Sequence, residues 1–185
     1  MIDVNQLRKG TNFTVDNEIY KVLDYRHHKP GRGKATIRCN VRNLRSGSVT
    51  EMTFTSGDRV QNIRVDTIEV EYLYDDGQFL HFMDTETYEQ PQLRREIFGD
   101  DMQYLMENIA LKLSQYENEI IDYILPTTID HEVVEAEAAV AGDTATGATK
   151  KVKTQTGLEV TVPLFVNVGD TIRVNTDSGD YVTRV

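Results

Sequence analysis

Residues 25–39 read Tyr-Arg-His-His-Lys-Pro-Gly-Arg-Gly-Lys-Ala-Thr-Ile-Arg-Cys, and they predict two strands joined by an exposed basic loop. From residue 35 to residue 42, apolar and polar side chains alternate, which is the period of a half-buried strand. Pro30-Gly31 is the pair favoured at the centre of a type II turn, and Gly33 is a second residue that tolerates positive φ. Arg32 therefore stands at the tip of a hairpin, between two glycines.

The loop and its flanks are rich in cations, namely Arg26, Lys29, Lys34, Arg38, Arg42 and Arg45. A guanidinium such as that of Arg32 is permanently charged and can bind a phosphate bidentately or stack on a base. The hairpin is therefore a candidate contact with nucleic acid. The alternative is a solvated hairpin with ordinary surface charges, and spacing alone does not separate the two.

Charge is distributed unevenly along a chain whose formal net charge is −10. Residues 1–64 carry twelve Lys/Arg and six Asp/Glu, residues 65–127 carry three and fifteen, and residues 128–185 carry five and nine. Surface charges are screened beyond ~8 Å at physiological salt, so the basic first segment can act locally. The acidic middle segment would limit indiscriminate contact with phosphate and help to orient the chain, unless its carboxylates serve only as a soluble surface.

Short strands and turn signals recur through the whole chain and predict an all-β protein. In the first segment a hairpin turn at Asp16-Asn17 lies among about five short strands, which favours a small closed barrel. We expect three such barrels, formed by residues 1–64, 65–127 and 128–185, with packing between the first two because each core is small.

The middle segment should contain one short helix and one clear hairpin. Asp100 and Gln103 have the spacing of a capping box, and the apolar residues Met102, Leu105, Met106 and Ile109 repeat at helical spacing. The hairpin is predicted from residues 109–116 and 119–125. In the last segment the predicted strands are residues 129–137, 158–162, 164–168, 171–174 and 181–185.

Patterns that would indicate catalysis or a metal site are missing from the sequence. The histidines are scattered, at His27, His28, His81 and His131, and none has metal-ligand spacing with Cys or a carboxylate. His27 and His28 adjoin the loop and could contact phosphate or a base, while strand alternation predicts that one of them packs inward. We expect no metal, no membrane attachment and a cytoplasmic location.

Cys39 is the single cysteine of the chain, so no internal disulfide can form. It falls on the apolar side of its predicted strand. A small buried hydrophobe is therefore expected at this position, and a reactive thiol is the alternative.

The loop Lys29-Pro30-Gly31-Arg32-Gly33-Lys34-Ala35 resembles the first-domain loop of bacterial elongation factor P. Further motifs that resemble this family extend over the whole chain, and they are Leu44–Gly47, Tyr72–Gly77, Phe82–Gln90, Gly142–Thr144, Gly157–Gly169 and Ser178–Arg184. Each motif alone is weak, but together they are highly specific. The resemblance implies an SH3-like (KOW-like) barrel followed by two OB-like barrels in an elongated L shape.

The resemblance implies a monomeric translation elongation factor, not an enzyme, that binds both ribosomal subunits next to the peptidyl-tRNA in the P site. Arg32 would reach the acceptor end of the tRNA, and the RNA-binding loop around it would consist of Lys29, Pro30, Gly31, Gly33 and Lys34. Family precedent places the loop of Gly142, Asp143 and Thr144 near the E-site codon. Such a factor stimulates peptide-bond formation at consecutive prolines, whose rings restrict backbone geometry, by positioning the tRNA acceptor end.

No cofactor is implied, apart from a rhamnose on Arg32. An arginine tip resembles the subgroup in which a dedicated arginine rhamnosyltransferase attaches this sugar, whereas Pro30 and Gly33 resemble lysine-tip members. Two other functions stay open. One is a β-barrel RNA-binding module that does not act at the peptidyl-transferase centre, and the other is an enzyme that acts through Arg32 or Cys39.

Overall fold

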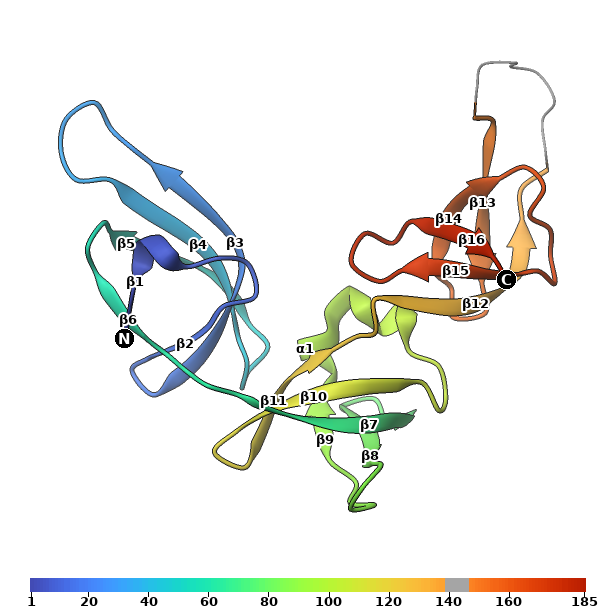
Figure 1. The fold of residues 1–185 in the computed structure, drawn as a ribbon, viewed down its shortest axis with the longest axis horizontal. Helices are drawn as coiled ribbons and strands as arrows, with labels where there is room; N and C mark the ends of the chain where they lie inside the picture. Colours follow the sequence, from blue (N-terminus) through green and yellow to red (C-terminus); the bar gives the residue numbers. More distant parts are fainter. Residues whose placement is uncertain (139–146) are drawn as a thin grey trace.

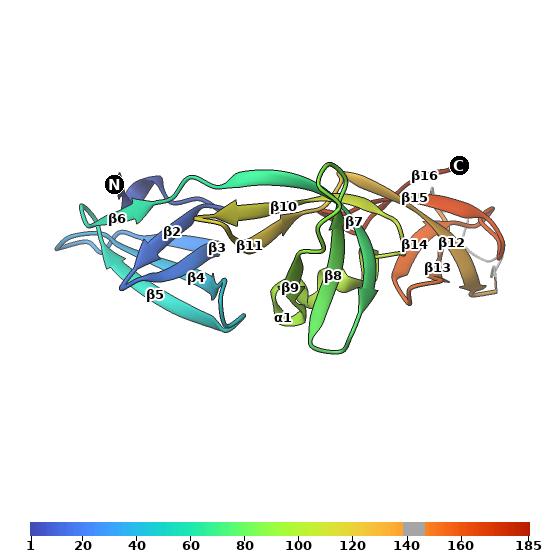
Figure 2. The same ribbon diagram turned by 90° about the horizontal axis from the view of Figure 1, so that it is seen from below.

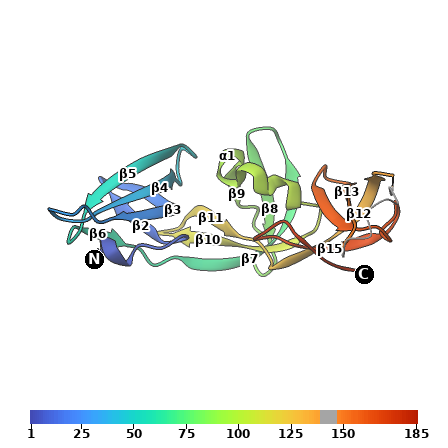
Figure 3. The ribbon, with the colours of Figure 1, turned by 90° about the horizontal axis from the view of Figure 1, so that it is seen from above.

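A computed structural model describes residues 1–138 and 147–185, which form three small β domains (Figure 1). Their sheets have six, five and five strands. Figure 1 shows the domains as a bent row with the central domain at the bend, and Figures 2 and 3 show that the row is thin in the perpendicular direction. The predicted all-β class, with three small barrels and one short helix in the middle domain, is confirmed.

The sheet of the N-terminal domain has the order β1-β6-β2-β3-β4-β5. Its elements are β1 (Ile2–Asp3), η1 (Val4–Gln6), β2 (Asn12–Val15), β3 (Glu18–His28), β4 (Thr36–Asn43), β5 (Val49–Thr55) and β6 (Arg59–Asn62). Asp16 and Asn17 join β2 to β3 with φ of +52° and +65°, as a tight hairpin turn requires. Cys39 is fully buried among the core residues, as its place on the strand predicts.

The central domain has the sheet order β11-β10-β7-β8-β9. Its elements are β7 (Asp66–Asp75), β8 (Phe79–Asp84), β9 (Gln92–Arg94), α1 (Arg95–Phe98), η2 (Gly99–Tyr104), β10 (Ala110–Tyr116) and β11 (Glu119–Ile124). The hairpin predicted from residues 109–125 is present as β10 and β11, which pair in antiparallel register.

The predicted helix over residues 100–109 is wrong in position and geometry. The helical segment begins at Arg95, turns at Gly99 with φ +52°, and continues as a 3-10 helix only to Tyr104. No side-chain cap forms at its start, so the expected capping box is absent. Met102 and Leu105 pack against the central core, whereas Tyr104 packs into the C-terminal core. The apolar residues of this segment therefore pack into two different cores. Their spacing does not mark one face of a helix.

The C-terminal domain has the sheet order β14-β13-β12-β15-β16. Its elements are β12 (Thr128–Ala136), β13 (Thr149–Thr154), β14 (Glu159–Pro163), β15 (Thr171–Asn175) and β16 (Tyr181–Arg184). The sequence did not predict β13, because its lysines obscure the alternation of Val152 and Thr154 toward the core. The strand predicted at residues 164–168 is wrong, since Val166 there closes a turn onto Pro163.

Neighbouring domains share buried side chains. Ile19 and Leu44 of the N-terminal domain belong to the hydrophobic cluster of the central domain, and Tyr104 of the central domain belongs to that of the C-terminal domain. The expected packing between the first two domains is therefore present. This packing fixes the direction in which the β3–β4 hairpin points.

Candidate nucleic-acid interface

The β3–β4 hairpin extends beyond the core of the N-terminal domain. Strand β3 is 11 residues long, and its last five residues, from Asp24 to His28, are all exposed. The pairing with β4 nevertheless continues to His28 opposite Thr36, so the hairpin stays hydrogen-bonded up to its loop. Figure 1 shows the loop at one end of the molecule, pointing away from the central domain. A rigid ladder therefore carries the loop outward.

His27 and His28 are both exposed. The prediction that one of them packs inward is wrong, because β3 has already left the core at Asp24 and alternation no longer implies burial on that strand. Both imidazoles are accessible beside the loop.

The loop presents every predicted contact residue to solvent, from Lys29 to Lys34. The predicted type II turn at Pro30-Gly31 is wrong, because Gly31 does not have positive φ and Gly33 has φ +104°. The reversal is therefore completed just after Arg32. A Cβ at either glycine would meet no atom within 4 Å, so the loop needs Gly33 for its backbone conformation and not for space.

Arg32 makes no side-chain hydrogen bond and no ion pair within the described part of the chain. Its guanidinium thus keeps all five donors available for a partner. The third-domain loop residues Gly142, Asp143 and Thr144 lie outside the described residues.

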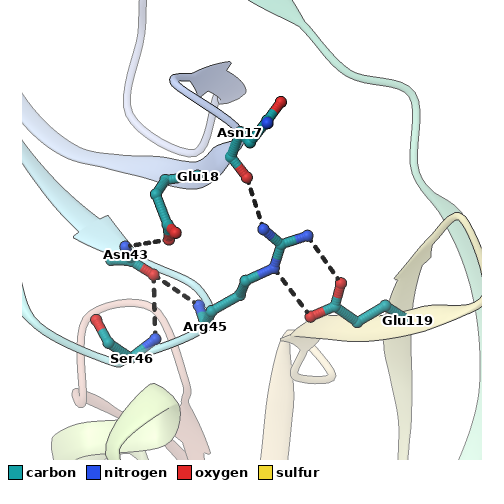
Figure 4. Close-up of polar contacts among 6 residues, drawn as sticks. All are labelled: Asn17, Glu18, Asn43, Arg45, Ser46 and Glu119. Carbon is teal, nitrogen blue, oxygen red and sulfur yellow. Dashed lines mark hydrogen bonds and ion pairs between the residues drawn. The ribbon is translucent and has the colours of Figure 1, made fainter.

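Arg45, which the sequence groups with the basic hairpin, turns instead toward the central domain (Figure 4). Its Nη1 donates to the Asn17 carbonyl at 2.6 Å, and its Nε and Nη2 each lie 3.2 Å from an oxygen of the Glu119 carboxylate. The hydrogen bond with Glu119 raises the pKa of Arg45 above its ordinary value. The pair joins the N-terminal and central domains.

A buried asparagine shapes the turn that carries Arg45. The Asn43 side-chain oxygen accepts from the amides of Arg45 and Ser46 at 2.8 and 3.0 Å, and its Nδ2 donates to Glu18 at 2.7 Å (Figure 4). Two of these hydrogen bonds lie within the β4–β5 turn, and the third ties Asn43 to the start of β3. Together they hold the turn in one conformation. Arg45 is thereby aimed at Glu119.

Two further cations of the N-terminal domain contact the central domain. Nη1 of Arg42 donates to the Ile97 carbonyl at 2.7 Å, and Nζ of Lys21 lies 2.8 Å from Oδ2 of the buried Asp122. Lys21 also lies 5.4 Å from the ring centroid of Tyr123. Arg42 and Arg45 are therefore interface residues, and the free basic surface of the hairpin is smaller than the sequence indicated.

Tyr123 completes the interface from the central side. Its ring stacks on Phe98 with centroids 3.7 Å apart, and its hydroxyl donates to Asp101 at 2.5 Å. Burial, followed by the hydrogen bond with Asp101, raises the pKa of Tyr123 well above its ordinary value. Sequence reasoning missed these contacts, although the opposite charges of the two adjacent segments were a signal for them.

Residues 1–138 and 147–185 offer neither a metal site nor a helix that could span a membrane. No group of three or more His, Cys, Asp and Glu side chains there could hold a metal ion. No helix in that part of the chain has the length and apolar character needed to cross a membrane.

Three small barrels in series, the first carrying a long basic hairpin, define a multi-barrel β protein. Three family models match successive parts of the chain: "Elongation factor P (EF-P) KOW-like domain" at residues 3–60, "Elongation factor P (EF-P) OB domain" at 65–123 and "Elongation factor P, C-terminal" at 129–184. The chain therefore belongs to the elongation factor P family and is a translation factor, as the sequence motifs predicted.

Two solved structures share a weaker likeness. Eukaryotic translation initiation factor 5A from Methanococcus jannaschii is 21% identical with a TM-score of 0.45, over 66% of this chain and 92% of that chain. A translation initiation factor eif-5a family protein from Naegleria fowleri is 14% identical with a TM-score of 0.42, over 67% of this chain and 96% of that chain.

Proposed function

We propose that this protein binds the ribosome next to the peptidyl-tRNA in the P site and stimulates peptide-bond formation at consecutive prolines. Family membership supports the translational role. The observation that carries the residue-level proposal is the unpartnered, exposed Arg32 at the end of a hydrogen-bonded hairpin. In this proposal Arg32 contacts the tRNA acceptor end, and Lys29 and Lys34 contact the RNA backbone on either side.

The physical contribution of such a contact is orientation. Proline locks its own φ and restricts the residue before it, so a proline-containing nascent chain can hold the reacting ester in an unproductive geometry. Fixing the tRNA end restores a productive arrangement, and orientation of reactants can lower a barrier by several kcal/mol. The protein supplies no reacting group. The chemistry belongs to the ribosome, and the protein acts as a monomeric, non-enzymatic factor in the cytoplasm.

Contacts with both ribosomal subunits are part of the proposal, with the loop of Gly142, Asp143 and Thr144 near the E-site codon. Rhamnose on Arg32, added by an arginine rhamnosyltransferase, would extend the tip. The exposed guanidinium is accessible to such an enzyme. Mass spectrometry of the native peptide that spans Arg32 tests this modification, and a mass increment on Lys34 instead would show that the lysine is the functional tip.

A reporter that contains three consecutive prolines tests the function in cells that lack the protein. Wild-type protein and Lys34→Ala should restore reporter synthesis, the latter partly, whereas Arg32→Ala should not. A matched reporter without prolines should be unaffected in every strain. If removal of the protein leaves the proline reporter unchanged, the protein is an RNA-binding module that acts away from the peptidyl-transferase centre.

A further inference from the structure

A cleft of about 570 Å³ opens where residues of all three domains meet, and we call it the interdomain cleft. Its charged side chains are segregated, with cations on the N-terminal wall and carboxylates on the walls of the other two domains. They are Lys9, Lys21 and Arg42 on the first wall, and Asp100, Asp101 and Asp177 on the others. The N-terminal and C-terminal domains therefore face each other here with opposite charge.

Two of the three cations on the N-terminal wall already have partners in the central domain. Nζ of Lys21 lies 2.8 Å from Oδ2 of Asp122, and Nη1 of Arg42 donates to the Ile97 carbonyl at 2.7 Å. Lys9 is exposed, and its ammonium makes no hydrogen bond or ion pair within residues 1–138 and 147–185. The charge of Lys9 is therefore free to act across the cleft.

Asp177 stands on the opposite side, in the tight turn between β15 and β16. The Asn175 side-chain oxygen accepts from the Asp177 amide at 2.8 Å, and the Gly179 amide donates to the Asn175 carbonyl at 2.8 Å. Thr176 ties the turn to the interdomain linker, because its hydroxyl donates to the Pro126 carbonyl at 2.5 Å. The turn thus holds an exposed carboxylate that has no partner of its own in the described part of the chain.

The N-terminal and C-terminal domains are each attached to the central domain but not to each other. Two of the hydrophobic clusters join the central domain to one neighbour, and no cluster among the described residues contains side chains of both outer domains. No hydrogen bond or ion pair joins them there either. Figure 1 shows the turn between β15 and β16 pointing toward the N-terminal domain. A contact across the cleft would add a direct link that the fold otherwise lacks.

We propose that Lys9 and Asp177 form an ion pair across the interdomain cleft, and that this pair sets the angle between the first and third domains. The structure shows the state in which the pair is open. A lysine ammonium sits on a flexible four-carbon stem, so the pair can form with a small change in that angle. The inference does not rest on the proposed role at the ribosome.

The expected pair is weak and therefore adjustable. Exposed ion pairs favour the paired state by about two- to fivefold, and they contribute little to the free energy of unfolding. Salt screens such a pair, so the closed state should predominate at low ionic strength and decline as salt is added. A charged partner that entered the cleft would open it in the same way.

Cysteine cross-linking of the full-length protein tests whether the two residues meet. The variant Lys9→Cys/Asp177→Cys should form an intramolecular disulfide under mild oxidation, because bridged cysteines need Cβ atoms about 4 Å apart. The native Cys39 is fully buried and should not compete. The control Lys29→Cys/Asp177→Cys places one thiol in the β3–β4 loop and should stay reduced. Failure of the first variant to cross-link would overturn the inference.

Electron–electron double resonance tests whether charge controls the width of the cleft. Spin labels at Gln6→Cys and Ser178→Cys, two exposed positions near Lys9 and Asp177, report the distance between the outer domains. Lys9→Glu should reduce the population at short distance by about two- to fivefold at low salt. The exchange Lys9→Glu/Asp177→Lys should restore it, and Lys29→Glu, with the same change of charge, should have no effect.

Salt gives an independent readout with the labelled protein that keeps Lys9 and Asp177. At about 1 M salt, where the screening length falls to about 3 Å, its distance distribution should approach that of Lys9→Glu. A distribution that ignores both Lys9→Glu and salt would overturn the inference. So would an exchange variant that stays as open as Lys9→Glu.

Discussion

Gly47 of the N-terminal domain lies against Glu96 of the central domain so closely that a Cβ at Gly47 would stand 2.6 Å from the Glu96 Cβ. Gly47 also has φ +78°, and its amide donates to the Asn43 carbonyl at 2.8 Å. Backbone conformation and interdomain contact thus exclude a side chain for separate reasons. Gly47 lies in the same turn as Arg45. The Gly47–Glu96 contact and the Arg45–Glu119 ion pair therefore join the two domains at one place.

Gly47→Ala should destabilise the protein more than Gly57→Ala does. Gly57 also has positive φ, at +98°, but a Cβ there would meet nothing within 4 Å, so it carries the backbone penalty alone. We expect Gly47→Ala to lose about 1–3 kcal/mol more, as for other overpacked sites. Urea unfolding at equal m-values measures the difference. Equal losses of unfolding free energy in the two variants would mean that the domains can move apart at position 47 with almost no free-energy cost.

Lys21→Met should leave the buried Asp122 carboxylate without its cation. Oδ1 of Asp122 already lacks a hydrogen-bond partner within the described residues, so loss of the 2.8 Å contact at Oδ2 isolates the group. We expect a loss of about 1–3 kcal/mol, less than for a fully buried pair because Lys21 is partly exposed. Lys9→Met, at an exposed position of the same domain, serves as the control in denaturant unfolding. The double variant Lys21→Met/Asp122→Leu should recover much of the stability, and failure to do so would contradict this account.

Stability should fall as the pH drops below about 6.5, through His131. Its Nδ1 lies 3.2 and 3.3 Å from the Thr154 and Thr156 hydroxyls, and Thr156 in turn donates to the Gln103 carbonyl of the central domain. Burial lowers the pKa of His131 below its ordinary value of 6.5. The unfolded chain therefore takes up the proton first, and the stabilisation present at neutral pH is lost on acidification.

Denaturant unfolding of wild type and His131→Gln at about pH 7.5 and about pH 5.5 measures this effect. The variant should show a smaller stability difference between the two conditions. An unchanged difference would show that groups other than His131 cause the acid sensitivity in this pH range.

Gly33→Ala should impair the proline reporter, whereas Gly31→Ala should be tolerated. Neither Cβ would clash, but Gly33 alone has positive φ, so only this substitution forces the loop to change its path around Arg32. Both variants should melt within a few degrees of wild type, because an exposed loop contributes little to stability. Equal activity of the two variants would show that the position of Arg32 is not set by the loop backbone.

Local chemistry predicted most of the fold. Asp and Asn tolerate positive φ, so Asp16-Asn17 indicated a tight turn between strands, and the alternation from Ile37 to Val41 indicated burial of one sheet face. The loop around Arg32 was predictable as exposed and basic because its glycines, proline and cations are local features of the sequence. Its contact with tRNA stays a prediction, as do its modification and the roles of the residues beside it.

Features that depend on two domains were not predictable. Arg42 and Arg45 look like part of the basic hairpin in the sequence, and only the placement of Ile97 and Glu119 shows that they bridge the interface. The apolar spacing after Asp100 suggested a helix, because a linear pattern cannot show that Tyr104 and Leu105 enter different cores. In each case the missing information was the identity of a distant partner.

The place of Tyr104 has a consequence for how this molecule can be divided. Its ring is a buried member of the C-terminal core although it belongs to the central segment of the sequence. A fragment that starts at residue 128 would lack Tyr104. The space that its ring fills in the C-terminal core would then be open to water, and the core would lose the packing contacts of that ring. The border between the two matched families and the border of the C-terminal hydrophobic core therefore differ at Tyr104.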